Sequence, residues 1–204
     1  STDPQHYTAG FPMHPHRGIE TISYVYSGAM VHRDSLGNED GITDGGVQWM
    51  TSGSGILHEE KLPPVGRLFG VQLWLNMKAK DKMTDPAYTP IRSEEIKEIP
   101  FDGGMLRLLA GRYEEHEGYL SKYQPVDYYD VHIAPGKRFE MKVDENRAIT
   151  LFTLIGEAEI EGQKVENFRA AILNNGDTLV IDNKTEEENA VLVFMSDPIK
   201  EPIA

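Results

Sequence analysis

Short apolar runs separated by turn residues make up the first part of the chain. Residues 19–26 and 68–75 are rich in β-branched, aromatic and other apolar side chains, which is typical of β-strands. Gly28 ends the first run, a second strand is expected near 29–32, and residues 34–41 have the composition of a turn. No segment of the sequence combines a long helical period with helix caps. These patterns predict strands joined by turns.

The second part of the chain continues in the same way. Further strands are expected at residues 128–133, 138–143, 148–155, 158–160, 170–173, 178–181 and 190–195. Asn174-Asn175-Gly176 is a strong turn signal between two of them. The charged, proline-containing stretch 79–100 is typical of a connector, with a long surface loop as the alternative. We therefore predict an all-β protein with an N-terminal barrel (1–78), a connector (79–100) and a C-terminal barrel (101–204).

Two short segments carry pairs of potential metal ligands. His14 and His16 lie two residues apart in the first segment, and His58 and Glu60 lie two residues apart in the second. Residues two apart in a strand project from the same face of the sheet. Two strands that each offer two ligands from an inner face predict a four-ligand metal site. Glu59 is expected to point to the opposite face.

Glycines relate the two halves of the chain to each other. Gly28 and Gly156 each follow an expected strand, and Gly46 and Gly176 each precede an apolar strand. When the halves are aligned on these glycines, the second-half counterparts of the four candidate ligands are Lys142, Asp144, Glu188 and Ala190. No histidine occupies these positions. The repeat predicts two double-stranded β-helix barrels in tandem, which is the cupin architecture, with metal ligands in the first barrel and none in the second.

The proposed donor set is three imidazoles and one carboxylate. It suits Fe(II), and also Mn, Co, Ni, Cu or Zn. A six-coordinate metal with four protein ligands would keep about two positions open for dioxygen or a chelating substrate. A closed four-coordinate structural site is the alternative. The donor set predicts one divalent transition metal without choosing among these ions.

The amino-acid composition excludes or disfavours several classes of function. The sequence contains no cysteine, which excludes disulfides, iron–sulfur clusters and thiolate zinc sites and suits a reducing compartment. The net charge of −13 disfavours direct binding to a phosphate backbone. No apolar run approaches the roughly 20 residues that span a bilayer, and the N-terminal residues lack signal-peptide features. We therefore expect a cytoplasmic protein without direct nucleic-acid or membrane contact.

Several longer motifs resemble one protein family. They are His14-Pro15-His16-Arg17-Gly18-Ile19-Glu20-Thr21 with Gly28, which also resembles the first cupin motif; Asp34-Ser35 with Gly37; Val47-Gln48-Trp49-Met50-Thr51-Ser52-Gly53-Ser54-Gly55-Ile56-Leu57-His58 with Glu60; Lys80-Asp81-Lys82-Met83; and Ser196-Asp197-Pro198-Ile199-Lys200-Glu201-Pro202. In these motifs the chain resembles the pirin family over nearly its whole length. Members of that family extend beyond both ends of this sequence, which leaves the barrel edges and the oligomeric state open.

The resemblance implies a bicupin whose N-terminal barrel holds a metal, usually iron. Carried over by position, the ligands are His14, His16, His58 and Glu60, whereas Glu20, a ligand in many other cupins, is not one. Some pirins open the central ring of flavonols such as quercetin with dioxygen. The resemblance therefore implies an Fe(II)-dependent enzyme of the quercetin 2,3-dioxygenase type. Its substrates would be a flavonol-like molecule and O2, and Glu60 would be both a ligand and the catalytic base.

Two other functions remain open. Mammalian pirins are nuclear cofactors of transcription factors, in which the oxidation state of the iron alters binding. The resemblance thus also implies a redox-sensing cofactor that acts through protein partners, in the nucleus as well if the source is eukaryotic. A metal-stabilised interaction module without enzymatic activity is the third reading. A roomy, partly apolar pocket that reaches the metal would favour the enzyme, and a sealed pocket with a charged patch on its rim would favour the sensor.

Other residues near these motifs have plainer expected roles. Trp49 and Met50 are expected in the barrel core, with a place on the substrate side as the alternative. Gln48 and Arg17 are candidates for donors to the metal ligands, with a solvated or turn role equally open. His32 is expected at the surface, with a hydrogen-bonding role near the pocket as the alternative.

Overall fold

The protein is described by a computed structural model that covers residues 1–174 and 176–201. Contacts divide the chain into two compact units, Ser1–Ile96 with residues 199–201, and Lys97–Pro198. Helical structure in the described residues is limited to three short 3-10 helices, η1 (Pro4–His6), η2 (Ala79–Asp81) and η3 (Ser93–Glu95). None of the helices described is long and apolar enough to cross a membrane. The prediction of an all-β protein is confirmed.

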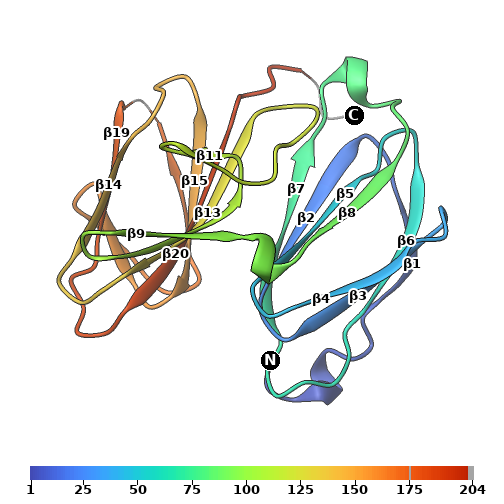
Figure 1. Ribbon diagram of the computed structural model, residues 1–204, viewed down its shortest axis with the longest axis horizontal. Helices are drawn as coiled ribbons and strands as arrows, with labels where there is room; N and C mark the ends of the chain where they lie inside the picture. Colours follow the sequence, from blue (N-terminus) through green and yellow to red (C-terminus); the bar gives the residue numbers. More distant parts are fainter. Residues whose placement is uncertain (175, 202–204) are drawn as a thin grey trace. The chain divides into compact units, whose positions relative to one another are not determined.

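The first unit is a barrel of two four-stranded antiparallel sheets (Figure 1). In strand order, one sheet contains β1 (Phe11–His16), β6 (Ile56–Lys61), β3 (Ala29–Asp34) and β4 (Glu39–Thr43), and the other contains β7 (Phe69–Asn76), β2 (Ile19–Ser27), β5 (Gly46–Thr51) and β8 (Ala87–Ile91). In β6, the buried Ile56, His58 and Glu60 alternate with three more exposed residues. This period of two shows that one face of β6 points into the barrel.

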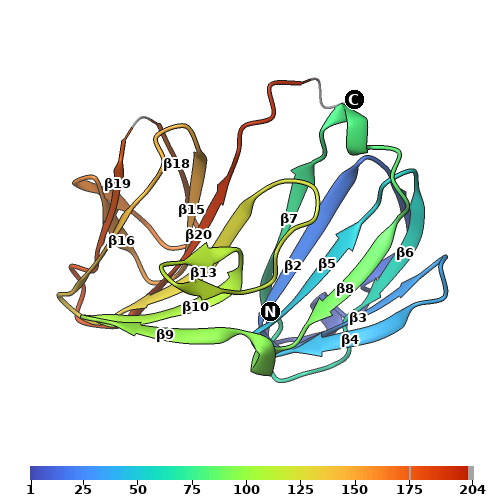
Figure 2. The same cartoon turned by 45° about the horizontal axis from the view of Figure 1, so that its top comes forward.

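The second unit is built from a larger and a smaller sheet. In strand order, the larger sheet contains β18 (Ala170–Leu173), β15 (Ala148–Ile155), β20 (Asn189–Ser196), β13 (Val126–Ile133), β10 (Gly104–Ala110) and β9 (Lys97–Phe101). The smaller sheet contains β14 (Arg138–Lys142), β19 (Thr178–Asp182), β16 (Ala158–Ile160) and β17 (Gln163–Val165), and a hairpin is formed by β11 (Arg112–Tyr113) and β12 (His116–Glu117). Figure 2 shows both barrels from a second angle.

The stretch 79–100, expected to be a connector, contains η2, β8, η3 and most of β9. β8 pairs with β5 and β9 pairs with β10, so each of these strands extends a sheet of its own unit. The boundaries of the connector and of the two predicted domains stay a prediction. The expected turn at Asn174-Asn175-Gly176 includes Asn175, which lies outside the described residues.

The strand order of the first barrel recurs in the second. The order β1-β6-β3-β4 corresponds to β14-β19-β16-β17, and the order β7-β2-β5 corresponds to β20-β15-β18. The internal repeat is therefore present. The glycine alignment nevertheless misplaced the counterparts of the ligands. Gly46 begins β5, whereas Gly176 precedes β19, the counterpart of β6, so the two glycines are not equivalent.

The pairing registers give the correct counterparts. His32 pairs with Glu60 in the first barrel as Ile160 pairs with Ile181 in the second. The positions that correspond to His14, His16, His58 and Glu60 are therefore Met141, Val143, Leu179 and Ile181, not Lys142, Asp144, Glu188 and Ala190. All four are apolar and lie in the core of the second barrel or pack against it. The same fold thus carries polar inner positions in one barrel and apolar ones in the other.

Candidate metal centre

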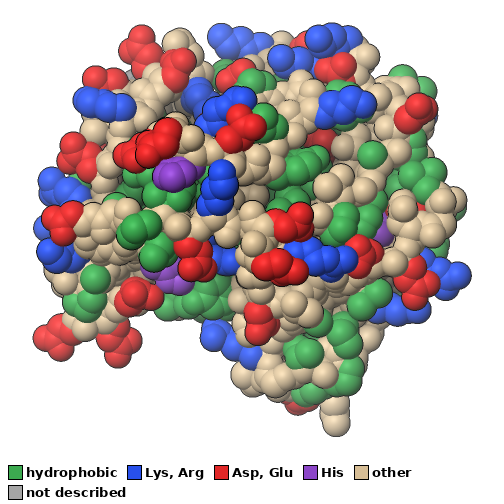
Figure 3. Space-filling view, viewed as in Figure 1, with side chains coloured by type: hydrophobic (Ala, Val, Ile, Leu, Met, Phe, Trp, Pro, Cys, Tyr) green, Lys and Arg blue, Asp and Glu red, His purple; other side chains and the backbone are tan. Residues whose placement is uncertain are grey.

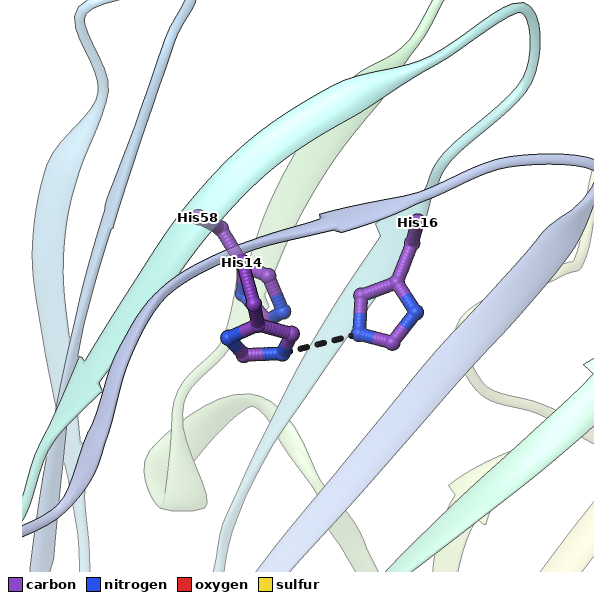
Figure 4. Close-up of side chains that lie close together, drawn as sticks. All are labelled: His14, His16 and His58. Carbon is purple, nitrogen blue, oxygen red and sulfur yellow. Dashed lines mark hydrogen bonds between the residues drawn. The ribbon is translucent and has the colours of Figure 1, made fainter.

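Strands β1 and β6 bring together three histidines that lie far apart in the sequence. The two strands pair antiparallel, with His14 directly opposite His58. His16 follows two residues after His14 and therefore lies on the same face of β1. Figure 4 shows the three rings gathered at these two strands. We call His14, His16 and His58 the three-histidine cluster.

One ring nitrogen from each member of the cluster lies within 4.8 Å of the others. Nε2 of His14 is 3.0 Å from Nε2 of His16. Nδ1 of His14 lies 2.7 Å from the carbonyl oxygen of Pro12, and because a carbonyl only accepts, this nitrogen carries the proton and donates. Nε2 of His14 is then left with its lone pair directed at the cluster.

His58 is the most enclosed member of the cluster, with 1% of its surface exposed. Across the described part of the chain, no hydrogen-bond partner reaches its Nε2, although that atom is buried. Burial, together with the neighbouring His14 and His16, lowers the pKa of His58 to about 3. Burial and His14 also lower the pKa of His16. Near neutral pH both rings are therefore neutral, the form in which imidazole binds metals.

These features fit a divalent metal ion. The Nε2 atoms of His14 and His16 lie 3.0 Å apart, so both rings could bind the same ion. The Nε2 of His58, buried and without a hydrogen-bond partner among the described residues, is a polar atom that a metal ion would satisfy. The three-histidine cluster can therefore hold a metal.

Glu60 lies beside the three-histidine cluster but is not one of its members. Its side chain is buried, and Nε2 of Gln72 donates to its Oε1 at 2.8 Å. Ser23 also bonds to the carboxyl group. Burial raises the pKa of Glu60, against the opposing effect of Gln72 and of nearby His14. The structure thus brings three of the four predicted ligands together and places the fourth next to them, so that its role as a ligand stays a prediction.

A cavity of about 360 Å³ opens next to Glu60 in the first unit. Ser23 and Gln72, which hold the Glu60 carboxyl group, form part of its lining, and most of the remainder is apolar, including Met30, Leu62 and Phe69. Beside the cluster, Trp74 is 65% exposed. Its ring meets that of His16 edge-on, with the ring centres 5.1 Å apart. Trp74 therefore provides exposed apolar surface beside His16, whereas the cavity reaches the site through Ser23 and Gln72, the partners of Glu60.

The expected surface position of His32 is wrong, and the alternative, a hydrogen-bonding role near the site, agrees with the structure. His32 is 1% exposed, and its Nδ1 lies 3.4 Å from Nδ1 of His58. Its Nε2 lies 2.9 Å from Oδ2 of Asp34, and its ring stacks on Tyr88 with the ring centres 4.0 Å apart. Burial lowers the pKa of His32 despite Asp34. The available signal was the spacing of His32 and Asp34, two residues apart in a strand, which is the spacing of the other ligand pairs.

Contacts run from His58 through His32 to Asp34, and several hydrogen bonds hold Asp34 in place. Its Oδ1 accepts from the backbone N–H groups of Leu36 and Asn38, and its Oδ2 accepts from the amide of Asn38. Burial works to raise the pKa of Asp34, but hydrogen bonds from Asn38, His32 and Leu36 outweigh it and hold the pKa below its usual range. A charged carboxylate therefore faces His32.

The carboxyl group of Glu20 accepts hydrogen bonds from other residues of the barrel. Nε1 of Trp49 donates to its Oε1 at 3.0 Å, and the hydroxyl of Thr51 donates to the same oxygen at 2.7 Å. Burial raises the pKa of Glu20, against these two bonds. Trp49 and Met50 are buried core residues, as expected.

The remaining residues near the motifs bond to partners outside the three-histidine cluster. Glu59 is 3.4 Å from Lys61 and 3.8 Å from Arg33, which places it on the outer face of β6. Gln48 is buried and donates to the Met30 carbonyl oxygen. Arg17 is exposed and contacts the sulfur of Met83.

Two tandem β-barrels, the first with three inward-facing imidazoles, define a bicupin with a candidate metal site. Comparisons with known proteins agree with this class. The Pirin family model matches residues 1–75, and the model of the Pirin C-terminal cupin domain matches residues 128–204. The chain belongs to the pirin family.

Individual relatives cover nearly the whole chain. A Thermoplasma acidophilum protein, provisionally named as a quercetin 2,3-dioxygenase, is 38% identical over 97% of this chain and 84% of the relative. Human pirin is 32% identical over 95% of this chain and 69% of its own length. The crystal structure of a quercetin 2,3-dioxygenase from Acinetobacter baumannii is similar with a TM-score of 0.87 and 35% identity, covering 95% of this chain and 69% of that one.

Proposed function

We propose that this protein is an Fe(II)-dependent dioxygenase of the quercetin 2,3-dioxygenase type, which cleaves a flavonol with O2 and releases carbon monoxide. The observation that carries the proposal is the three-histidine cluster, in which the buried Nε2 of His58 has no partner among the residues described. The names of the relatives from T. acidophilum and A. baumannii support the choice of reaction.

Each polar side chain of the site has a proposed task. His14, His16 and His58 would hold the metal, with Glu60 as the fourth ligand. When bound, the metal supplies Lewis acidity and a template for substrate and O2. Glu60 takes the proton from the 3-hydroxyl group of the flavonol. Gln72 keeps the Glu60 carboxylate oriented.

The apolar surfaces of the site fit a flat aromatic substrate. The cavity beside Glu60 has a volume of about 360 Å³, which falls within the range of small-molecule sites. Trp74 exposes 65% of its surface next to His16, so its ring is available to stack on an aromatic ligand. The exposed ring of Trp74 beside His16 supports an aromatic substrate, and the cavity is bounded in part by Ser23 and Gln72, which hold the Glu60 carboxyl group.

The surface charge supports a small-molecule substrate over nucleic acid. On the face shown in Figure 3, Asp and Glu side chains are interspersed with Lys and Arg. The chain carries a net charge of −13. A phosphate backbone would therefore be repelled by the protein as a whole.

The test begins with metal-free protein loaded with Fe(II) under anaerobic conditions. Quercetin and O2 are then added, and the loss of flavonol absorbance is followed together with oxygen uptake. We expect loss that depends on iron and consumes one O2 for each flavonol. His58→Ala should remove both the bound iron and the turnover. Unchanged absorbance at full iron occupancy would contradict the proposal, and oxidation-dependent binding to protein partners would become the leading function.

A matched pair of carboxylate variants tests the proposed role of Glu60. Glu60→Gln should lower turnover by about 100-fold or more, because it removes the proton acceptor. Glu59→Gln makes the same chemical change on the outer face of the same strand and should leave turnover unaltered. Equal activity of the two variants would remove Glu60 from the reaction.

A further inference from the structure

Asp34, His32 and His58 form a continuous series of contacts inside the first barrel. The carboxylate of Asp34 meets Nε2 of His32 at 2.9 Å, and Nδ1 of His32 meets Nδ1 of His58 at 3.4 Å. All three residues are buried, with 5%, 1% and 1% of their surface exposed. The series ends at Nε2 of His58, the buried nitrogen that lacks a partner within the described residues.

The chemistry of each contact fixes where the protons lie. A carboxylate only accepts, so Nε2 of His32 must carry a proton and donate to Asp34. A neutral imidazole has one N–H and one lone pair, so Nδ1 of His32 is an acceptor. Nδ1 of His58 must then carry the proton that this contact requires. Nε2 of His58 is left with a lone pair, which is what a metal ligand needs.

We propose that Asp34 and His32 are positioning residues that set the tautomer of His58 and aim its Nε2 at the metal. This inference rests on the proposed role of His58 as a ligand, but not on the dioxygenase reaction. Partners that orient a ligating histidine through its other ring nitrogen strengthen metal binding in general. The stack of His32 on Tyr88, with an interplanar angle of 5°, holds the intermediate ring in place.

The surroundings of Asp34 make one substitution especially informative. Its Oδ1 accepts from two backbone N–H groups, those of Leu36 and Asn38. In Asp34→Asn, the amide oxygen must take that place, so the NH2 group faces His32. Nε2 of His32 then becomes an acceptor, and the His32 proton moves to Nδ1. Nδ1 of His58 must accept in turn, and its proton moves to Nε2, where it blocks the metal.

Two measurements on the full chain test this inference without using turnover. The first is long-range 1H–15N NMR of the metal-free protein, which distinguishes the two histidine tautomers, with His58→Leu used to assign the His58 signals. We expect the Nδ1–H form of His58 in the unmodified protein and the Nε2–H form in Asp34→Asn. The second is Fe(II) affinity, measured anaerobically by competition with a chelator. We expect Asp34→Asn to bind Fe(II) about 10- to 100-fold more weakly.

Asn38→Ala separates this role from structural support of the turn. It removes the Asn38 amide that bonds to Oδ2 of Asp34 but leaves the contact between Asp34 and His32 intact. We expect it to lower stability while keeping the Nδ1–H tautomer and the Fe(II) affinity. An Nε2–H tautomer in the unmodified protein, or unchanged Fe(II) affinity in a folded Asp34→Asn, would overturn the inference. If the unmodified protein bound no Fe(II), the proposed ligand set would fail instead.

Discussion

Acid should destabilise the metal-free protein through His58. The folded barrel lowers the pKa of this histidine from 6.5 to about 3, whereas the unfolded chain restores the ordinary value. Between these two values the unfolded state binds a proton that the folded state rejects. The free energy of unfolding must therefore fall as the pH drops below about 6.5, and the loss levels off near pH 3.

The size of the effect follows from the same shift. Each pH unit between the two pKa values removes about 1.4 kcal/mol. At pH 5, roughly 1.5 units below the ordinary pKa, His58 should have cost about 2 kcal/mol of stability. Burial also lowers the pKa of His16 and His32, which adds to the loss. The raised pKa values of Glu20 and Glu60 act in the opposite direction, so the contribution of His58 must be isolated by a variant.

The assay compares the chelator-treated protein with His58→Leu in urea at pH 7.5 and pH 5.0. Leu is the natural choice because Leu179 occupies the corresponding position of the second barrel. Both tryptophans, Trp49 and Trp74, lie in the first unit, so tryptophan fluorescence reports on the unfolding of that unit. The unmodified protein should lose about 2 kcal/mol more than the variant between the two pH values. Losses that agree within about 0.5 kcal/mol, the usual scatter of such comparisons, would refute the reasoning.

Three further predictions follow from other parts of the molecule. Glu20→Ala should leave the iron content unchanged, as measured by elemental analysis. It should lower the free energy of unfolding by about 2 kcal/mol or more, because two buried donors lose their acceptor. Loss of iron in a folded variant would make Glu20 a ligand. Trp74→Leu should raise KM for quercetin up to about tenfold with little change in kcat, since an aromatic contact contributes about 0.5–1.5 kcal/mol; an unchanged KM would remove Trp74 from the substrate site. Leu179→His should destabilise the second barrel by about 2 kcal/mol, because it buries an imidazole in an apolar core. Thermal unfolding followed by circular dichroism measures the effect, and undiminished stability would contradict the apolar character of that core.

The sequence was sufficient to predict the fold class and the three histidines that converge. Strand periodicity places residues two apart on one face regardless of what surrounds the strand, so His14 and His16 could be assigned together from local pattern alone. The antiparallel pairing of β1 with β6, which sets His14 opposite His58, is a long-range fact that no local pattern contains. The hypothesis that the two ligand pairs share one site supplied that link, and the resemblance to the pirin family supported it.

Burial was the property that local pattern could not supply. His32 sits in a strand beside charged residues, and the sequence around it is typical of a surface edge. In the structure, Tyr88 from β8 covers one side of its ring, and His58 from β6 lies against Nδ1. Both neighbours are distant in sequence, so the inward orientation of His32 depends on the closed barrel. The glycine alignment failed for a related reason, because a glycine marks a turn without saying which pair of strands the turn joins.

The two barrels together show how one fold can be stable with or without a polar interior. In the second barrel, Leu179 and Ile181 at the corresponding positions are buried in the apolar core, and the hydrophobic effect favours their burial. In the first barrel, His58 and Glu60 occupy those positions at the cost of desolvation, which is visible as the lowered pKa of one and the raised pKa of the other. Such groups are expected where they serve function, since an apolar pair fits the same strand positions without that cost. The contrast between the barrels therefore supports the proposed metal site in the first barrel.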